Sequence, residues 1–177
     1  VPVLLLNKAE QDEQAPATQG MPIHSLSLSQ SEEAVAIARA VLDHGQKNAV
    51  VVVPSSAWGK RIGEAFSTEF QARGGSIAAS TEFDRSQNDY SDMLTRLLKI
   101  DESVQRKQAL QAQIGTPLGF EPIRRSDFDF IFLAASPQEG RELKPLLRFH
   151  DAGDVPVYSI GRVYNGRGET ARDQDLD

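Results

Sequence analysis

Cysteine is absent from the 177-residue chain, which excludes disulfide bonds, thiolate zinc sites and cysteine nucleophiles within it. No apolar run approaches the ~20 residues that a membrane-spanning helix needs. The net charge of −6 argues against a general nucleic-acid-binding protein, because such proteins usually carry a basic patch. The chain begins with Val1-Pro2-Val3 instead of Met, and we interpret it as a mature or excised fragment.

Several catalytic and cofactor-binding motifs are also missing. The turn from Pro54 to Lys60 has the spacing of neither a phosphate-binding P-loop nor a GxGxxG dinucleotide loop, and the GxSxG nucleophile motif does not occur. Asp127-Phe128-Asp129 is similar to a metal-binding DxD motif. It falls at the predicted start of a strand, however, whereas sites in open α/β sheets lie beyond strand ends. We therefore expect no enzyme activity, no cofactor and no metal site.

The most informative stretch runs from Asn48 to Gly75. It opens with the apolar run of residues 49–53, which is typical of a strand buried on both faces of a parallel sheet. An apolar residue then recurs every four positions, which predicts an amphipathic helix with a buried stripe of Trp58, Ile62, Phe66 and Phe70. A second strand is predicted directly after Gly75. Together these elements form a βαβ unit.

Strands and helices alternate along most of the chain. We expect strands at residues 1–6, 23–28, 49–53, 76–83, 128–134 and 155–160, and helices starting near Ser29, Ser56, Tyr90, Asp101 and Ser136. This alternation predicts an α/β fold with a parallel sheet and helices on both faces, a three-layer α/β/α arrangement. Pro145 should kink the last helix or divide it into two short segments.

Candidate ligand-binding residues are the serines near the predicted strand ends: Ser55, Ser56, Ser136 and Ser159. Ligands bind open α/β sheets beyond the carboxyl ends of the strands, and binding sites need convergent polar groups. The alternative is structural, because serine commonly caps the first turn of a helix. Under that alternative Ser55 and Ser56 simply begin the helix that follows them.

Several motifs together resemble one known family. They are Val53-Pro54-Ser-Ser-Ala-Trp-Gly59, Ile100-Asp-Glu-Ser-Val-Gln-Arg106, Arg124 to Pro137, Leu143-Lys-Pro145, Asp154 to Ser159 and Asp173 to Leu176. This set resembles the penicillin-binding-protein activator lipoproteins of Gram-negative bacteria, also described as LppC-type outer-membrane lipoproteins. The resemblance covers nearly the whole chain and is most specific between Arg124 and Asp175.

The resemblance implies one lobe of a type I periplasmic-binding-protein-like fold. Residues 1–22 would then hold a crossing strand and a linker from a missing lobe, residues 23–160 the α/β lobe, and residues 161–177 a polar segment leading back. It also implies a non-catalytic, periplasmic regulator of peptidoglycan synthesis and cell shape. The full protein would be anchored to the outer membrane by an N-terminal lipid absent from this fragment, and would activate a class A penicillin-binding protein by contact.

Two functional hypotheses follow. In the first, the predicted helix at Asp101–Ile114 and the loop after it dock onto the synthase, with Arg106, Arg124 and Arg125 as candidate partner-binding residues. The alternative for this segment is a helix folded back on its own lobe, because helices usually bury an amphipathic face. In the second hypothesis, the lobe is a periplasmic receptor for an amino acid or cell-wall fragment, bound at the four serines.

Overall fold

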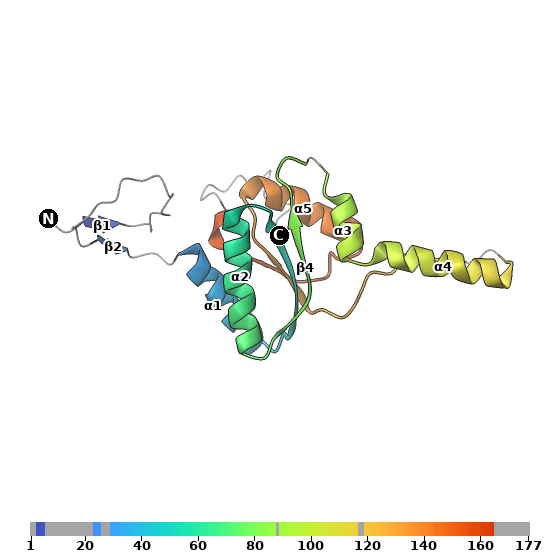
Figure 1. The fold of residues 1–177 in the computed structure, drawn as a ribbon, viewed down its shortest axis with the longest axis horizontal. Coiled ribbons are helices and arrows are strands. Elements are labelled where there is room, and N and C mark those ends of the chain that lie inside the picture. Colours follow the sequence, from blue (N-terminus) through green and yellow to red (C-terminus); the bar gives the residue numbers. More distant parts are fainter. Residues whose placement is uncertain (1–2, 6–22, 26–28, 88, 117–118, 165–177) are drawn as a thin grey trace.

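The computed structural model describes residues 3–5, 23–25, 29–87, 89–116 and 119–164. At its centre lies a parallel sheet of four strands in the order β4-β3-β5-β6. Helices cover both faces of this sheet, which confirms the predicted α/β/α arrangement (Figure 1). The strands are β3 (Asn48–Pro54), β4 (Ser76–Phe83), β5 (Phe130–Leu133) and β6 (Val157–Ser159).

Strand β3 lies in the interior of the sheet because both of its faces are apolar. Val50 and Val52 belong to the core cluster on one face, whereas Ala49, Val51 and Val53 belong to the cluster on the other. Alternate side chains of a strand point to opposite faces, so an unbroken apolar run serves both layers. The strand predicted from this run is therefore confirmed.

Helices α1 (Gln30–Asp43) and α2 (Ala57–Ala72) cover one face together. Helix α1 begins at a capping box: Glu32 N–H donates to Ser29 Oγ at 3.2 Å, and Ser29 N–H donates to Glu32 Oε2 at 2.6 Å. Helix α2 ends just before Gly74, whose φ of +92° favours glycine. Both boundaries agree with the sequence patterns.

Stacked phenylalanines fill the space between α2 and the sheet. The ring of Phe66 stacks on Phe132 with a centroid distance of 4.0 Å and on Phe70 at 5.3 Å. Phe130 meets Phe66 and Phe70 edge-on, at 6.2 and 5.6 Å. All four rings are fully buried, and aromatic pairs in these geometries stabilise a core beyond their buried area.

Helices α3 (Ser91–Leu97) and α5 (Pro137–Phe149) cover the opposite face, where Leu94, Leu143 and Leu147 are buried. The sequence predicts a kink at Pro145 or a division into two short segments; the division is wrong, because α5 continues through Pro145 as one helix, and the kink stays a prediction. Leu143 and Leu147 lie on either side of the proline and both pack into the core, while Pro145 itself faces solvent. Burial of the flanking leucines holds the helix together despite the missing N–H.

Helix α4 (Ile100–Ile114) extends away from the rest of the domain (Figure 1). It follows α3 after a sharp turn at Lys99, whose φ is +57°. The predicted helical extension is thus confirmed, and the chain returns to β5 through residues 119–129.

Asp129 fastens the amino-terminal edge of the sheet. Its Oδ2 accepts hydrogen bonds from the backbone N–H groups of Lys47 and Asn48, both at 2.8 Å. These two bonds lower the pKa of the Asp129 carboxyl below its ordinary value. Asp129, the second aspartate of the DxD sequence, therefore has a structural role.

Strands β1 (Val3–Leu5) and β2 (Ile23–Ser25) pair with each other in parallel as a separate two-stranded sheet. The loop between them and residues 165–177 lie outside the described residues. A short 3₁₀ helix, η1 (Gly161–Val163), follows β6.

Candidate functional site

The four candidate serines all fall at the carboxyl-terminal edge of the parallel sheet. Ser55 and Ser56 follow β3, Ser136 follows β5, and Ser159 is the last residue of β6. Since β3 pairs with β5 and β5 with β6, the topology brings these residues to one edge, as predicted. Their joint role in ligand binding stays a prediction.

Two of the four hydroxyl groups cap helices. Ser56 Oγ accepts from Gly59 N–H at 3.2 Å, and Ser136 Oγ accepts from Glu139 N–H at 3.5 Å. The Ser55 N–H donates to the Phe83 carbonyl at 2.9 Å, which ties the end of β3 to the end of β4. Ser56 and Ser136 therefore have the helix-capping role that was the structural alternative to ligand binding.

Ser159 differs from the other three serines. Its Oγ is buried and has no hydrogen-bond partner among the described residues. Buried hydroxyl groups are usually paired, so the Ser159 hydroxyl is a buried polar group that could still pair with a ligand.

Trp58, with two arginines over its ring, lies at the same edge and was not recognised as a site in the sequence. The guanidinium carbons of Arg162 and Arg85 lie 4.8 and 5.3 Å from the centroid of the Trp58 ring. The indole N–H donates to Gln30 Oε1 at 2.5 Å. Cations over an aromatic face are attracted by its quadrupole, so the indole orders both guanidinium groups.

Buried Glu139 anchors one of these arginines. Arg85 Nε lies 2.8 Å from Glu139 Oε1, and Glu139 Oε2 accepts from Ser136 N–H at 2.7 Å. The carboxylate thus links the first turn of α5 to the loop after β4. Trp58 offered the only sequence signal for this cluster, since it stands in the first turn of a helix directly after a strand.

Among the described residues, no group of three or more His, Asp or Glu side chains is placed so that it could hold a metal ion.

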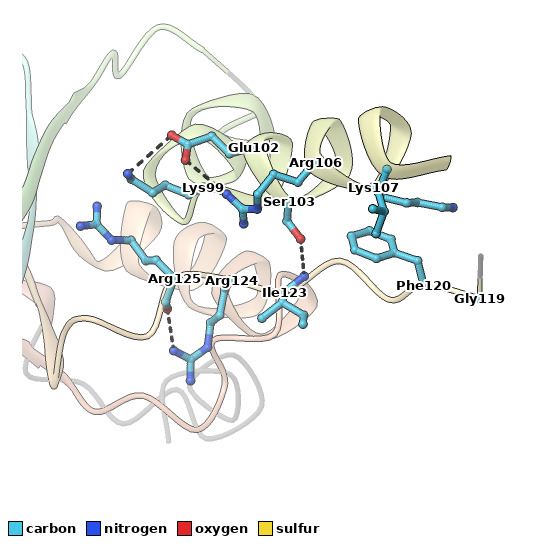
Figure 2. A pocket seen from close by; sticks show the side chains of 11 residues that line it. Lys99, Glu102, Ser103, Arg106, Lys107, Gly119, Phe120, Ile123, Arg124 and Arg125 are labelled. Carbon is cyan, nitrogen blue, oxygen red and sulfur yellow. Dashed lines mark hydrogen bonds and ion pairs between the residues drawn. The ribbon is translucent and has the colours of Figure 1, made fainter. Parts of the chain in front are cut away.

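The second candidate surface is formed by α4 and the chain that returns beneath it (Figure 2). Ser103 is the one buried residue of the helix, and its Oγ accepts from the Ile123 N–H at 3.1 Å. Nearer the domain, Arg125 N–H donates to the Leu98 carbonyl at 2.8 Å. These two bonds hold residues 119–125 alongside the base of α4.

Arg124 and Arg125 fix this returning segment to the domain. The Arg125 side chain is only 10% exposed; it pairs with Asp127 at 2.6 Å and donates to the Ala78 carbonyl at 3.0 Å. This pairing raises the pKa of Arg125 and lowers that of Asp127. Arg124, 17% exposed, binds both carboxylate oxygens of Asp154 at 3.0 Å.

Arg106 is the accessible member of the three predicted partner-binding arginines. Its side chain is 68% exposed and lies 3.7 Å from Glu102, one turn earlier on α4. A groove of about 550 Å³ runs between the helix and the returning segment. Its described lining comprises five cations (Lys99, Arg106, Lys107, Arg124, Arg125), one acid (Glu102), the apolar Leu110, Phe120 and Ile123, and Ser103 and Gly119.

The fold is similar to those of solute-binding proteins of ABC transporters. One from R. palustris, in complex with benzoate, matches with a TM-score of 0.60 and 17% identity, covering 88% of this chain and 35% of that chain. Another from R. palustris, in complex with 4-hydroxybenzoate, has a TM-score of 0.59 and 16% identity, covering 86% and 35%. This likeness confirms the periplasmic-binding-protein-like fold.

Curated relatives carry a functional name. The penicillin-binding protein activator LpoA of Vibrio antiquarius is 27% identical over 151 residues, covering 84% of this chain and 25% of that protein. Its namesake from Photobacterium profundum is 27% identical over 121 residues, covering 68% and 20%. The chain thus spans about a quarter or less of the length of these relatives.

One family model covers the entire sequence. The family described as "LppC putative lipoprotein" matches residues 1–177. The match confirms the resemblance seen in the motifs between Val53 and Leu176. This chain belongs to the LppC lipoprotein family.

Proposed function

We propose that this chain is a non-catalytic regulatory lobe that activates a class A penicillin-binding protein by protein–protein contact. The names of its relatives support an activator role, and the family description supports a lipoprotein. In this proposal the whole protein is held at the outer membrane by an N-terminal lipid and works in the periplasm. Residues 1–22 and 161–177 would connect the lobe to a second one.

The α4 arm, defined here as residues 99–125, is the observation that favours a docking role. Helix α4 has 15 residues and buries Ser103 alone. Isolated helices of this length are marginal in water, and most helices gain stability by burying an apolar face. An arm that projects from its own core (Figure 1) therefore has its surface available for a partner.

The described residues add one observation on membrane association. They contain no helix that is long and apolar enough to cross a bilayer. Independently of this finding, the proposal assigns the membrane contact to the lipid of the whole protein and the synthase contact to the arm.

Binding of the 177-residue chain to purified class A penicillin-binding proteins tests this function. Biolayer titrations should give saturable binding, and synthase activity should rise when the chain is added. A variant in which residues 105–114 are replaced by a Gly/Ser linker of equal length should lose binding while its melting temperature changes little, because those residues contribute nothing to the core. A folded chain that binds no such synthase contradicts the proposal.

A receptor function is the second candidate, favoured by the Trp58–Arg85–Arg162 cluster. The two R. palustris neighbours are described in complex with aromatic carboxylates, and guanidinium groups pair well with carboxylates. Thermal-shift titration with benzoate, amino acids and muropeptides tests it, since a ligand that binds the native state raises the melting temperature. The absence of any shift at millimolar concentrations argues against a receptor.

A further inference from the structure

We propose that the groove between α4 and residues 119–125 binds an acidic segment of the penicillin-binding protein that also carries apolar side chains. This inference rests on the proposed function and specifies the chemistry of the contact. It follows from the charge of the arm, the exposure of its cations and the position of its apolar side chains.

The α4 arm is electropositive on an acidic protein. Residues 99–125 contain five cationic and three acidic side chains, a net charge of +2. Since the whole chain has a net charge of −6, the remaining residues together carry −8. Opposite charges on two surfaces steer their encounter and fix their relative orientation. A negatively charged segment is therefore attracted to the arm and repelled by the remainder of the lobe.

The outward cations of the groove have little internal compensation. Lys99 and Arg106 lie 3.6 and 3.7 Å from the same Glu102, so two positive charges share one carboxylate. Lys107 faces the ring of Phe120, with its Nζ 5.3 Å from the centroid (Figure 2). Carboxylates of an incoming segment would pair with these three cations. Arg124 and Arg125 differ, because they are already paired with Asp154 and Asp127.

Exposed apolar side chains also concentrate on the arm. Five large hydrophobic side chains of the described residues are notably exposed, and three of them belong to the arm. They are Leu110 at 48%, Ile114 at 52% and Ile123 at 67%. Leu110 and Ile123 line the groove beside its cations. Exposed apolar surface of this kind marks a contact site, and it calls for apolar residues among the acidic ones of the partner.

The shape of this surface favours a protein segment over a lipid bilayer. Leu110 and Ile123 line a groove between two stretches of backbone, whereas membrane-surface helices present a continuous apolar face with a basic border. A narrow segment fits between these two stretches of backbone, whereas a flat bilayer does not.

Charge reversal with a matched control tests the groove. The double variant Arg106→Glu/Lys107→Glu is compared with Lys60→Glu/Arg61→Glu, which makes the same change of charge on exposed positions of α2. Affinity for the penicillin-binding protein is measured at low and high salt, together with the melting temperature of each variant. We expect the groove variant to lose about tenfold in affinity and most of the salt dependence, and the α2 variant to remain within about twofold.

The outcomes separate this inference from the proposed function. If the wild-type chain does not bind the synthase, the proposed function fails. If it binds and both double variants bind equally well, the activator role stands and the acidic-segment inference is overturned. Loss of self-association by the groove variant in sedimentation, or loss of binding to vesicles containing phosphatidylglycerol without loss of synthase binding, also overturns it by assigning the groove to another occupant.

Discussion

Helices α2 and α4 have nearly the same length, 16 and 15 residues, but opposite relations to the core. Helix α2 buries Ile62, Phe66 and Phe70 against the sheet together with two glycines, whereas α4 buries Ser103 alone. The first is stabilised by its own domain. Helix α4 is rich in good helix formers such as Ala, Gln, Lys and Arg. Its own sequence therefore favours a helix even though the core contributes little to its stability.

The same contrast divides the charged residues. Arg124 and Arg125 serve the domain, because each is largely buried and ion-paired. Arg106 is exposed and lines the same groove as Leu110 and Ile123, which are 48% and 67% exposed. Exposure therefore separates residues that build the arm from residues available to a partner.

The largest expected effect comes from the α2 side of this comparison. Phe66→Ala removes a ring that is 0% exposed and stacked on Phe70 and Phe132, and should lower the free energy of unfolding by about 3–5 kcal/mol. Leu110→Ala, at a position 48% exposed on α4, should change it by less than about 0.5 kcal/mol. Urea denaturation measures both; equal losses would show that the two helices are supported alike.

The arginines give the next effect. Arg125→Ala breaks the pair with Asp127 and the bond to the Ala78 carbonyl, so we expect a loss of about 1–3 kcal/mol of stability. Arg106→Ala should leave stability within about 0.5 kcal/mol and should weaken synthase binding. Thermal unfolding and binding titration distinguish the two. A stable Arg125→Ala variant with impaired binding would place Arg125 at the interface instead.

The smallest effect concerns pH and the carboxylate of Asp129. Its pKa is lowered by hydrogen bonds from two backbone N–H groups, so it stabilises the fold above its unfolded pKa of about 3.9. This contribution is lost as the pH falls through the still lower folded value. Asp129→Asn should therefore flatten the acid side of the stability profile, by less than about 1 kcal/mol at this solvent-exposed site. Denaturation from about pH 2 to 7 checks this; a profile parallel to wild type would contradict it.

Much of the fold could be predicted because its signals are local. The valine run of β3, the four-residue spacing on α2 and the serine that begins α5 each specify an element without distant information. Pro145 shows the limit of such signals: a division of the helix was one of the two outcomes expected there, but α5 is continuous and buries leucines on both sides of the proline. Tertiary packing is not visible in that local pattern.

The sites were less predictable because they depend on distant partners. The sequence pointed to Arg106, Arg124 and Arg125 alike. Asp127 lies only two residues from Arg125, but it is the fold that brings Asp154 to Arg124 and buries both arginines. Likewise, Trp58 appears in the sequence as part of an apolar stripe. The two arginines over its ring are Arg85 and Arg162. They are far from Trp58 in the sequence and meet it only in the folded chain.

Hydrogen exchange of α4, with and without a class A penicillin-binding protein, tests the central claim most directly. The free chain should exchange the amides of residues 105–114 rapidly, because few contacts protect them, while the buried amides of α2 exchange slowly. In the complex, the α4 amides should slow by at least about tenfold, because a partner now holds the helix. An α4 already protected like α2, or one unchanged by saturating synthase, would contradict this account.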